Sequence, residues 1–289
     1  MDFLRALDSH PALLYMAVAL LGLCVGSFLN VVIYRLPKMM EAQWRAECAS
    51  LDGGEAPTPA EPFNLATPRS RCPSCAAPIT AWQNVPVVSW LMLRGKCAAC
   101  NAPISARYPA VEVAAGTLAV ILAWRFGYSG ALAWALLLGW ALLALTFIDF
   151  DTQLLPDDIT LPLLWAGLIA NTFATFTDLR SAVLGAAGGY LLLWTVYWGF
   201  RLIAKKEGMG YGDFKLLGAL GAWLGWQVLP FVVVVSAGAG AIIGGLLLWR
   251  ARRGIETRIP FGPYLALGGL AGLLWGRQAV IAWIGHYPA

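Results

Sequence analysis

The sequence predicts an all-α polytopic membrane protein, on the strength of its composition, the lengths of its apolar segments and the distribution of its basic residues. Of the 289 residues, 59% are hydrophobic and only 12% are charged. So few charges cannot cover the surface of a soluble domain. The apolar residues fall into blocks of about 18 to 23, the length of helix that crosses a hydrocarbon core roughly 30 Å thick.

About eight transmembrane helices are predicted. They are residues 12–34, 110–126, 131–148, 158–176, 181–203, 213–228, 230–249 and 260–284. The first segment is too long for a secretory signal and has no small-residue cleavage site, so we expect it to remain as an anchor. The last is interrupted by Gly262, Pro263, Gly268 and Gly269, which a membrane helix tolerates when its neighbours satisfy the freed backbone groups.

The basic residues orient these segments. Arg5 alone precedes the first span, whereas Arg35 and Lys38 follow it directly, which predicts that the N-terminus lies outside the cytosol. Carried through eight spans, this orientation places 16 of the 20 Lys and Arg residues on inner segments and 4 on outer ones. The inner set includes Arg201, Lys205, Lys206, Lys215, Arg250, Arg252, Arg253 and Arg258, and the outer set is Arg5, Arg125, Arg180 and Arg277. Both termini are expected outside. Topogenic charge beside an anionic inner leaflet accounts for the net charge of +4, so we expect no nucleic-acid partner.

Three parts are expected along the chain: a transmembrane anchor at 1–34, a cytosolic loop at 35–109 and a transmembrane bundle at 110–289. The loop holds eight basic and five acidic residues, many prolines and four cysteines in two pairs. Residues 48–68 are rich in Gly, Pro, Ala and Glu and are expected to form a flexible excursion. We find no clear internal repeat.

The loop carries two CxxC pairs. Their cysteines are Cys72, Cys75, Cys97 and Cys100. Each pair can present two thiolates to one ion, and two pairs complete a tetrahedral site. A cytosolic location keeps thiols reduced, which disfavours disulfides. A small Pro-rich segment without a large core needs another stabilising cross-link, such as a bound metal ion. We therefore expect a structural four-cysteine zinc site, or one for another thiolate-preferring ion, with paired redox CxxC motifs as the alternative. Cys24 and Cys48 have no partner spacing and are expected to be packing or incidental residues.

Two aspartates lie at the ends of apolar segments. Asp149 ends the third, and Asp213 opens the sixth, closing the stretch Gly208-Met-Gly-Tyr-Gly-Asp213. The predicted topology puts both at the cytosolic membrane face, where an ionisable group is costly unless it has a function. Two carboxylates within about 3 Å cannot both ionise, so one can activate a water while its protonated partner polarises a peptide carbonyl. The pattern predicts an aspartyl protease, in which Gly210 and Gly212 allow close approach of an extended substrate.

Other interpretations of these acids stay open. Asp213 could cap the helix that follows it, and Asp151, Asp157 and Asp158 are expected to be solvated or capping residues. A proton-coupled transporter would also use paired acids, although nearer the membrane midplane. A third possibility is a metal-loop membrane scaffold without catalysis. The only histidines, His10 and His286, are predicted outside, which leaves acid–base chemistry at the cytosolic face to carboxylates.

Taken together, these motifs resemble the type IV prepilin peptidases, the bifunctional leader peptidase/N-methyltransferases of bacterial pilus and type II secretion systems. The resemblance covers nearly the whole chain. It rests on Gly26-Ser-Phe-Leu-Asn-Val-Val-Ile-Tyr-Arg-Leu-Pro37, Arg71-Cys-Pro-Ser-Cys75, Cys97-Ala-Ala-Cys100, Arg107-Tyr-Pro-Ala-Val-Glu112, Asp149 with its Leu-Leu-Pro-Asp157 tail, Gly210-Tyr-Gly-Asp213-Phe-Lys215 and Ile259-Pro-Phe-Gly-Pro-Tyr264.

The resemblance implies that Asp149 and Asp213 are the catalytic pair, with Gly210, Gly212 and Lys215 in a supporting active-site loop. It also implies a bacterial inner-membrane location. The substrates would be prepilins and pseudopilins, whose short basic leader is removed at the cytosolic face. The amine of the new N-terminal residue would then be methylated from S-adenosylmethionine. Both CxxC pairs are present, which favours this bifunctional form over a relative that only cleaves.

The site of the methyl donor is not marked by any motif. No glycine fingerprint of a Rossmann-type methyltransferase follows a predicted strand, so the donor would have to bind in another way. The candidates are Gly95, Lys96, Arg107 and Glu112, each of which is equally plausible as part of the scaffold.

Overall fold

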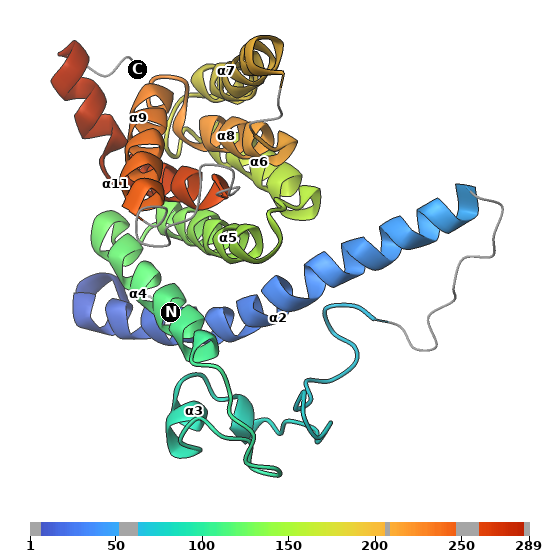
Figure 1. Ribbon diagram of the computed structural model, residues 1–289. Coiled ribbons are helices and arrows are strands. Elements are labelled where there is room, and N and C mark those ends of the chain that lie inside the picture. Colours follow the sequence, from blue (N-terminus) through green and yellow to red (C-terminus); the bar gives the residue numbers. More distant parts are fainter. Residues whose placement is uncertain (1–6, 52–62, 206–208, 247–259, 286–289) are drawn as a thin grey trace. The chain divides into compact units, whose positions relative to one another are not determined.

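The computed structural model describes residues 7–51, 63–205, 209–246 and 260–285. Within these ranges the protein is helical and contains two isolated antiparallel bridges but no strand (Figure 1). The chain forms two compact units, Met1–Tyr128 and Ser129–Ala289, here called the N-terminal and C-terminal units. Several residues of the sequence predictions lie outside the described ranges. They are Arg5, Lys206, Gly208, Arg250, Arg252, Arg253, Arg258 and His286.

The predicted all-α membrane fold is confirmed, because each of the eight predicted segments overlaps a helix. The helices are α2 (Pro11–Leu51), α4 (Arg107–Phe126), α5 (Gly130–Thr152), α6 (Asp157–Thr172), α7 (Leu179–Ala204), α8 (Tyr211–Leu224), α9 (Leu229–Ala239) and α11 (Gly262–Ile284). Among the described residues, five helices, α2, α4, α5, α7 and α11, are long and apolar enough to cross a membrane. Helices α6 and α8 have 16 and 14 residues, and α9 has 11 before it continues as the π-helix η2 (Gly240–Gly244). At 1.5 Å per residue they are shorter than the hydrocarbon core. The chain is therefore a multi-pass membrane protein.

Helix α2 extends well beyond the predicted end of the first span at residue 34. It continues to Leu51 with Pro37 inside it, so the first part of the predicted loop is helical. Side chains four residues apart support this polar extension, since Glu41 pairs with Arg45 and Gln43 donates to Glu47 at 3.0 Å. The missed signal is the run of good helix formers after Lys38.

The predicted excursion at 48–68 is structured at both ends. Residues 48–51 belong to α2, and 52–62 lie outside the described residues. Over 63–68, the Asn64 carboxamide accepts the N–H groups of Ala66 and Thr67, both at 2.8 Å. The buried Arg35 guanidinium donates to the carbonyls of Asn64 at 2.8 Å and Pro68 at 2.6 Å. The expectation of flexibility is wrong for these end segments, because an arginine of α2 holds the backbone in place.

Helix α4 packs along α2 in the N-terminal unit. The two backbones approach closely at Gly26, where a Cβ atom would lie 2.6 Å from the Cα of Glu112. Small residues at helix crossings permit such contact in membranes. The boundary between the units follows Tyr128, so residues 110–126, predicted as part of the C-terminal bundle, belong to the N-terminal unit. The short helices η1 (Trp82–Asn84) and α3 (Val88–Met92) complete this unit.

Helix α8 forms the centre of the C-terminal unit. Its side chains Phe214, Leu217 and Trp223 are fully buried, with α6, α7 and α11 packed around the helix. The Trp223 indole N–H donates to the Leu163 carbonyl of α6 at 2.8 Å. The Asn171 carboxamide donates to the carbonyls of Ala222 at 2.8 Å and of Trp223 at 3.0 Å, at the C-terminal end of α8. These bonds satisfy carbonyls that have no partner within the helix.

Helix α11 is continuous and accommodates the glycines and the proline of the last predicted span. Pro263 lies in the first turn, where a helix loses no backbone hydrogen bond. Gly268 and Gly269 are contact points, because a Cβ atom on either would collide with Ser236 or Leu220.

The contact between α7 and α8 depends on a pair of facing glycines, and this yields the first prediction. A Cβ atom on Gly185 would collide with the backbone of Gly221, whereas nothing lies within 4 Å of a Cβ on Gly188, one turn along α7. We expect Gly185→Ala to destabilise the protein by about 1–3 kcal/mol through overpacking. The control Gly188→Ala should be neutral or slightly stabilising. Thermal unfolding in detergent measures both, and equal melting temperatures for the two variants would contradict this packing.

Candidate functional site

Asp149 occupies the last turn of α5, and its side chain is buried. The backbone N–H of Gly262, at the first position of α11, donates to its Oδ2 at 2.9 Å. Only glycine fits there, because a Cβ atom on residue 262 would lie 2.7 Å from the same oxygen. The positive end of the α11 dipole thus faces this carboxylate, and the hydrogen bond fixes its orientation.

Asp213 lies in the first turn of α8 and is also buried. The N-cap of α8 is Gly210, so the alternative of Asp213 as the capping residue is wrong. Its backbone N–H donates to the Gly210 carbonyl at 3.3 Å. Its carboxylate accepts a hydrogen bond from the Gly210 backbone N–H, back across the first turn, and lies where the helix dipole favours a negative charge.

Leu155 packs against two glycines, Gly212 and Gly262, that neighbour the two acids. A Cβ atom on Gly212, next to Asp213, would lie 2.7 Å from the Leu155 Cβ, and one on Gly262 would lie 3.1 Å from its Cδ2. The two carboxylates are close enough to repel each other electrostatically when both are ionised. The structure thus brings the predicted pair together, from α5 and α8, at the N-terminal ends of α8 and α11.

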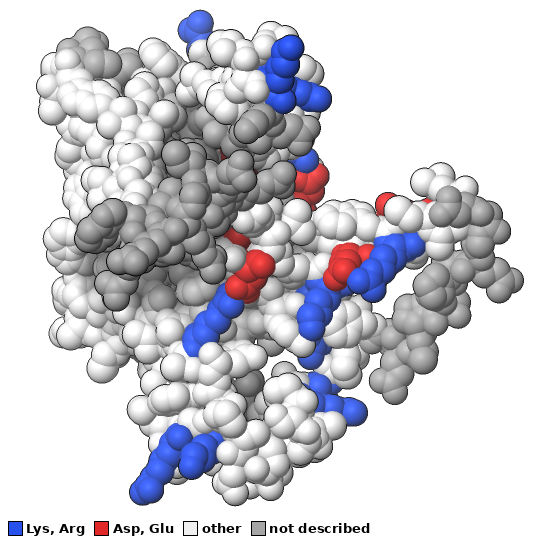
Figure 2. Space-filling model, viewed as in Figure 1, with Lys and Arg blue, Asp and Glu red and all other residues white. Residues whose placement is uncertain are grey.

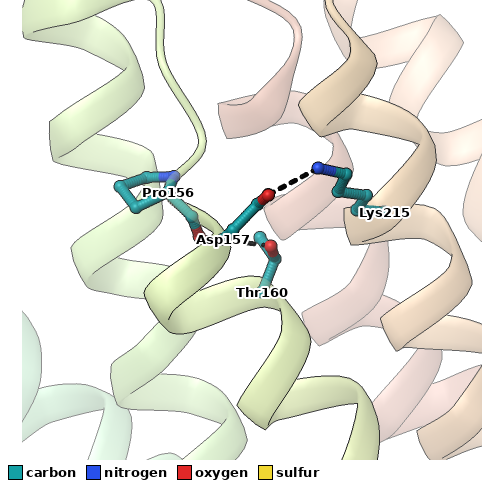
Figure 3. Close-up of polar contacts among 4 residues, drawn as sticks. All are labelled: Pro156, Asp157, Thr160 and Lys215. Carbon is teal, nitrogen blue, oxygen red and sulfur yellow. Dashed lines mark hydrogen bonds and ion pairs between the residues drawn. The ribbon is translucent and has the colours of Figure 1, made fainter. Parts of the chain in front are cut away.

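The predicted supporting residues have different structural roles. Gly212 is required by the close approach of Leu155, whereas a Cβ on Gly210 would meet only Asp213 Oδ2, at 3.8 Å. Lys215 points from α8 toward α6, as Figure 3 shows, and its Nζ lies 2.7 Å from both carboxylate oxygens of Asp157. Asp157, expected to be solvated or capping, is exposed and forms this ion pair from the first turn of α6.

Sequence reasoning missed Gly262 and Leu155 as parts of the site. Both were inside motifs that carried the family resemblance, but no local pattern indicated that residue 262 would reach Asp149, 113 positions earlier. The proximity exists only in the folded protein.

The four predicted cysteines form one cluster in the N-terminal unit. Their Sγ atoms all lie within 4.8 Å of one another, and those of Cys72 and Cys100 are 3.9 Å apart. A tetrahedral zinc site with Zn–S bonds of about 2.3 Å requires sulfur atoms about 3.8 Å apart. The backbone N–H groups of Cys75 and Ser74 point at Cys72 and lower the pKa of its thiol to about 6, which favours the thiolate that a metal binds. The donor set fits zinc.

The two CxxC turns are copies of one another. In the first, the backbone of Cys72 donates to Ala77 and accepts from Ala76, and Arg71 bridges Pro78. In the second, the corresponding residues repeat the same pattern. They are Cys97, Ala102, Asn101, Lys96 and Pro103. Ala76 and Asn101 have φ of 56° and 59°. The expectation of no internal repeat is therefore wrong: residues 71–79 and 96–104 form a short repeat that an alignment of the two segments would have found.

The candidate methyl-donor residues all belong to the N-terminal unit, and two of them lie at the second metal-binding turn. Gly95 has a φ of +68°, and a Cβ on it would lie 2.9 Å from the ring of Trp90. Lys96 is exposed and begins the second CxxC turn. Gly95 is thus explained by local packing, whereas nothing in the described backbone requires a lysine at 96.

Glu112 is buried on α4. Its Oε2 accepts the N–H of Val87 at 2.7 Å, and its side chain also bonds Ser27 of α2. Val87 has a φ of 60°, which is costly for a β-branched residue, so this bond stabilises a strained turn before α3. The remaining candidate, Arg107, is exposed at the start of α4.

Asn30 has a role that sequence reasoning did not assign. Its side chain donates to the Tyr108 carbonyl at 3.1 Å and thereby ties α2 to the start of α4. The motifs of the first span thus hold the N-terminal unit together.

Each half of the chain matches a known protein family. Residues 20–126 match the bacterial peptidase A24 N-terminal domain, and residues 136–245 match the type IV leader peptidase family. No solved structure matches significantly.

Curated relatives cover almost the whole sequence. The chain is 52% identical to the prepilin leader peptidase/N-methyltransferase of Stutzerimonas stutzeri over 282 residues, 96% of each chain. It is 52% identical to the protein of the same name from Pseudomonas aeruginosa over 278 residues, again 96% of each. For the Aeromonas hydrophila protein the identity is 53% over 279 residues, 94% of each. The chain therefore belongs to the type IV leader peptidase family.

Proposed function

We propose that this protein removes the leader of type IV prepilins and pseudopilins and then methylates the new N-terminal residue. The relatives named prepilin leader peptidase/N-methyltransferase align along 94–96% of the chain, so both activities are carried over. The observation that supports the peptidase most directly is the meeting of two buried aspartates, from α5 and α8.

In the proposed reaction, Asp149 and Asp213 act as a pair that shares one proton. The ionised carboxylate accepts a proton from water as the water oxygen bonds to the peptide carbonyl carbon, and the protonated carboxyl donates its proton to the carbonyl oxygen. When the intermediate collapses, the C–N bond breaks and the amine leaves with a proton from the pair. The Gly262 N–H keeps the Asp149 carboxylate in place during these transfers.

The substrate is proposed to reach the pair at the cytosolic face of the bacterial inner membrane, with both termini of the enzyme in the periplasm. This orientation rests on the 16 to 4 split of basic residues. It suits a substrate whose basic leader stays in the cytosol while its apolar segment lies in the bilayer. Leu155 and Gly212 flank Asp213, where an extended peptide would pass.

S-adenosylmethionine is the proposed methyl donor, and it supplies the methyl group for the new N-terminal amine. Zinc is the proposed occupant of the four-cysteine cluster, where four thiolates fill a tetrahedral coordination sphere and give the metal a structural role. Gly95, Lys96, Arg107 and Glu112 remain the proposed candidates for the donor site. Of these, exposed Lys96 and Arg107 carry positive charge that would attract the donor's carboxylate, while Gly95 and Glu112 support the fold around them.

Conversion of either aspartate to asparagine should abolish cleavage and spare methylation. Loss of a catalytic acid or base lowers turnover by about 10²- to 10⁴-fold, so we expect at least this loss in Asp149→Asn and in Asp213→Asn. The assay uses purified protein with full-length prepilin for cleavage, and with leaderless pilin and labelled S-adenosylmethionine for methylation. Asp158→Asn, in the first turn of α6, is the matched control. Wild-type cleavage by either variant, in preparations free of host peptidase, would refute the proposed pair.

Metal content tests the proposed zinc site. The purified protein should carry about one zinc ion per chain, and the double variant Cys97→Ser/Cys100→Ser should carry nearly none, because two thiolates alone do not complete the site. Cys48→Ser is the control, since Cys48 lies on the polar extension of α2 outside the cluster. Elemental analysis by mass spectrometry provides the count. Stoichiometric zinc in the double variant, or a metal-free parent protein, would overturn the assignment.

The ion pair between Lys215 and Asp157 is proposed to position the start of α8, and hence Asp213. Because the pair is partly exposed, its loss should cost at most about 1 kcal/mol of stability. Misplacement of a catalytic group lowers turnover much more steeply. We expect Lys215→Asp and Asp157→Lys each to lower kcat about tenfold with little change in KM. The double exchange should recover most of kcat. If it recovers nothing, Lys215 acts on the substrate and not through Asp157.

A further inference from the structure

The metal-binding part of the N-terminal unit exposes large apolar side chains at one place. The exposed fractions are 85% for Trp82, 79% for Met92, 61% for Leu91 and 52% for Val88. Val88, Leu91 and Met92 follow the i, i+3, i+4 spacing and so share one face of α3. A water-soluble surface rarely presents such a set, which indicates that this face meets another apolar phase.

This face continues into an open groove of about 630 Å³ between α3 and α4. Leu91 belongs to both, and the groove is lined by Trp90 with Ala110, Val113, Thr117 and Ile121 of α4. None of these side chains is charged. The groove therefore extends the apolar surface of α3 along a helix that is long and apolar enough to cross the membrane.

Two hydrogen bonds fix the position of α3 along the axis of α4. Glu112 accepts the N–H of Val87, which immediately precedes α3, and the Trp90 indole donates to the Ile104 carbonyl at 3.1 Å. Glu112 is five residues into α4, or about 7.5 Å along its axis. With α4 crossing the hydrocarbon core from Arg107 onward, α3 would lie at the depth of the lipid headgroups and the first acyl carbons.

The charges of the segment that contains α3, residues 63–109, all have one sign, and the nearby Glu112 of α4 is buried. From residue 63 to 109 the sequence contains no Asp or Glu and five basic residues. They are Arg69, Arg71, Arg94, Lys96 and Arg107. In Figure 2 the region around α3 shows blue and no red on the visible face. Basic residues near an anionic membrane surface are attracted to it. The same charges would repel a basic peptide, which argues against a prepilin leader at this surface.

We propose that α3 is an interfacial helix whose occupant is the anionic leaflet itself. The face of Val88, Leu91 and Met92 lies among lipid acyl chains, and an acyl chain fills the groove along α4. The exposed Arg69, Arg71 and Arg94, which the donor site does not use, contact the phosphate headgroups. Interfacial helices bind through this combination of a buried apolar face and basic residues. The proposal is independent of the peptidase and methyltransferase activities.

Site-specific fluorescence quenching tests the depth of α3. A single environment-sensitive label is placed at Met92→Cys in a zinc-loaded Cys24→Ser/Cys48→Ser background, in nanodiscs of phosphatidylglycerol and phosphatidylcholine. Leu20→Cys, exposed on the apolar part of α2, is the lipid control, and Ala42→Cys, on its polar extension, is the aqueous control. Val88→Cys replaces Met92→Cys if the latter does not fold.

Lipids carrying a spin label near the headgroup should quench the label at residue 92, as they quench the control label at residue 20. Iodide in the water should not quench it, although iodide quenches the control label at residue 42. Iodide quenching at residue 92 would place α3 in water, and protection from both quenchers would mean that protein covers it; either result overturns the proposal. Lipid quenching should be about twofold stronger with phosphatidylglycerol present than with phosphatidylcholine alone. Arg69→Gln/Arg94→Gln should remove that difference. Equal quenching of the parent in both lipids would refute the role of the basic residues.

Discussion

The enclosure of α8 is the constraint on which the C-terminal unit depends. A helix of only 14 residues is buried on all sides, and it holds Asp213 in its first turn. Its position is fixed at one end by the Asn171 carboxamide, along its length by the glycine contact with α7, and near the acid by the Lys215–Asp157 pair. A buried carboxylate costs several kcal/mol unless it has partners or a function. The fold tolerates that cost at the point where α5, α8 and α11 converge.

Different interactions hold the N-terminal unit together. Side chains of α2 and α4 act on the loop backbone: Arg35 holds the segment from Asn64 to Pro68, and Glu112 holds the turn at Val87. The four-cysteine cluster then joins two copies of one turn into a small body with no large hydrophobic core of its own. A segment of this size needs such a cross-link to be stable. Polar side chains of membrane helices and a cluster of thiols thus replace the usual apolar core.

Local sequence patterns predicted the parts of this architecture that depend on local chemistry. Apolar run length located the eight helices, CxxC spacing located the metal cluster, and the two aspartates at the ends of apolar runs located the candidate site. The helix boundary after residue 34 was missed because apolar length says nothing about a polar helix that continues beyond the membrane. The repeat of the CxxC turns was available in the sequence, in Cys-x-x-Cys-x-Ala-Pro-Ile at 72–79 and at 97–104.

What could not be predicted is the set of contacts between distant segments. Gly262 donates to Asp149 from another helix, Leu155 separates two glycines, and Asp157 pairs with Lys215 across 58 positions. Each depends on how the helices pack, which the apolar periodicity of a membrane helix leaves undetermined.

The affinity for a transition-state analogue tests the aspartate pair most directly. A leader peptide in which a hydroxyethylene group replaces the scissile amide presents one hydroxyl where the tetrahedral intermediate would form. Calorimetric titration would compare its binding to the parent protein, to Asp149→Asn and to Asp213→Asn. If both carboxylates surround the reacting carbon, each substitution should weaken binding about 10²-fold or more, while binding of the uncleaved substrate peptide changes little. Equal affinity of the analogue for all three proteins would contradict the account.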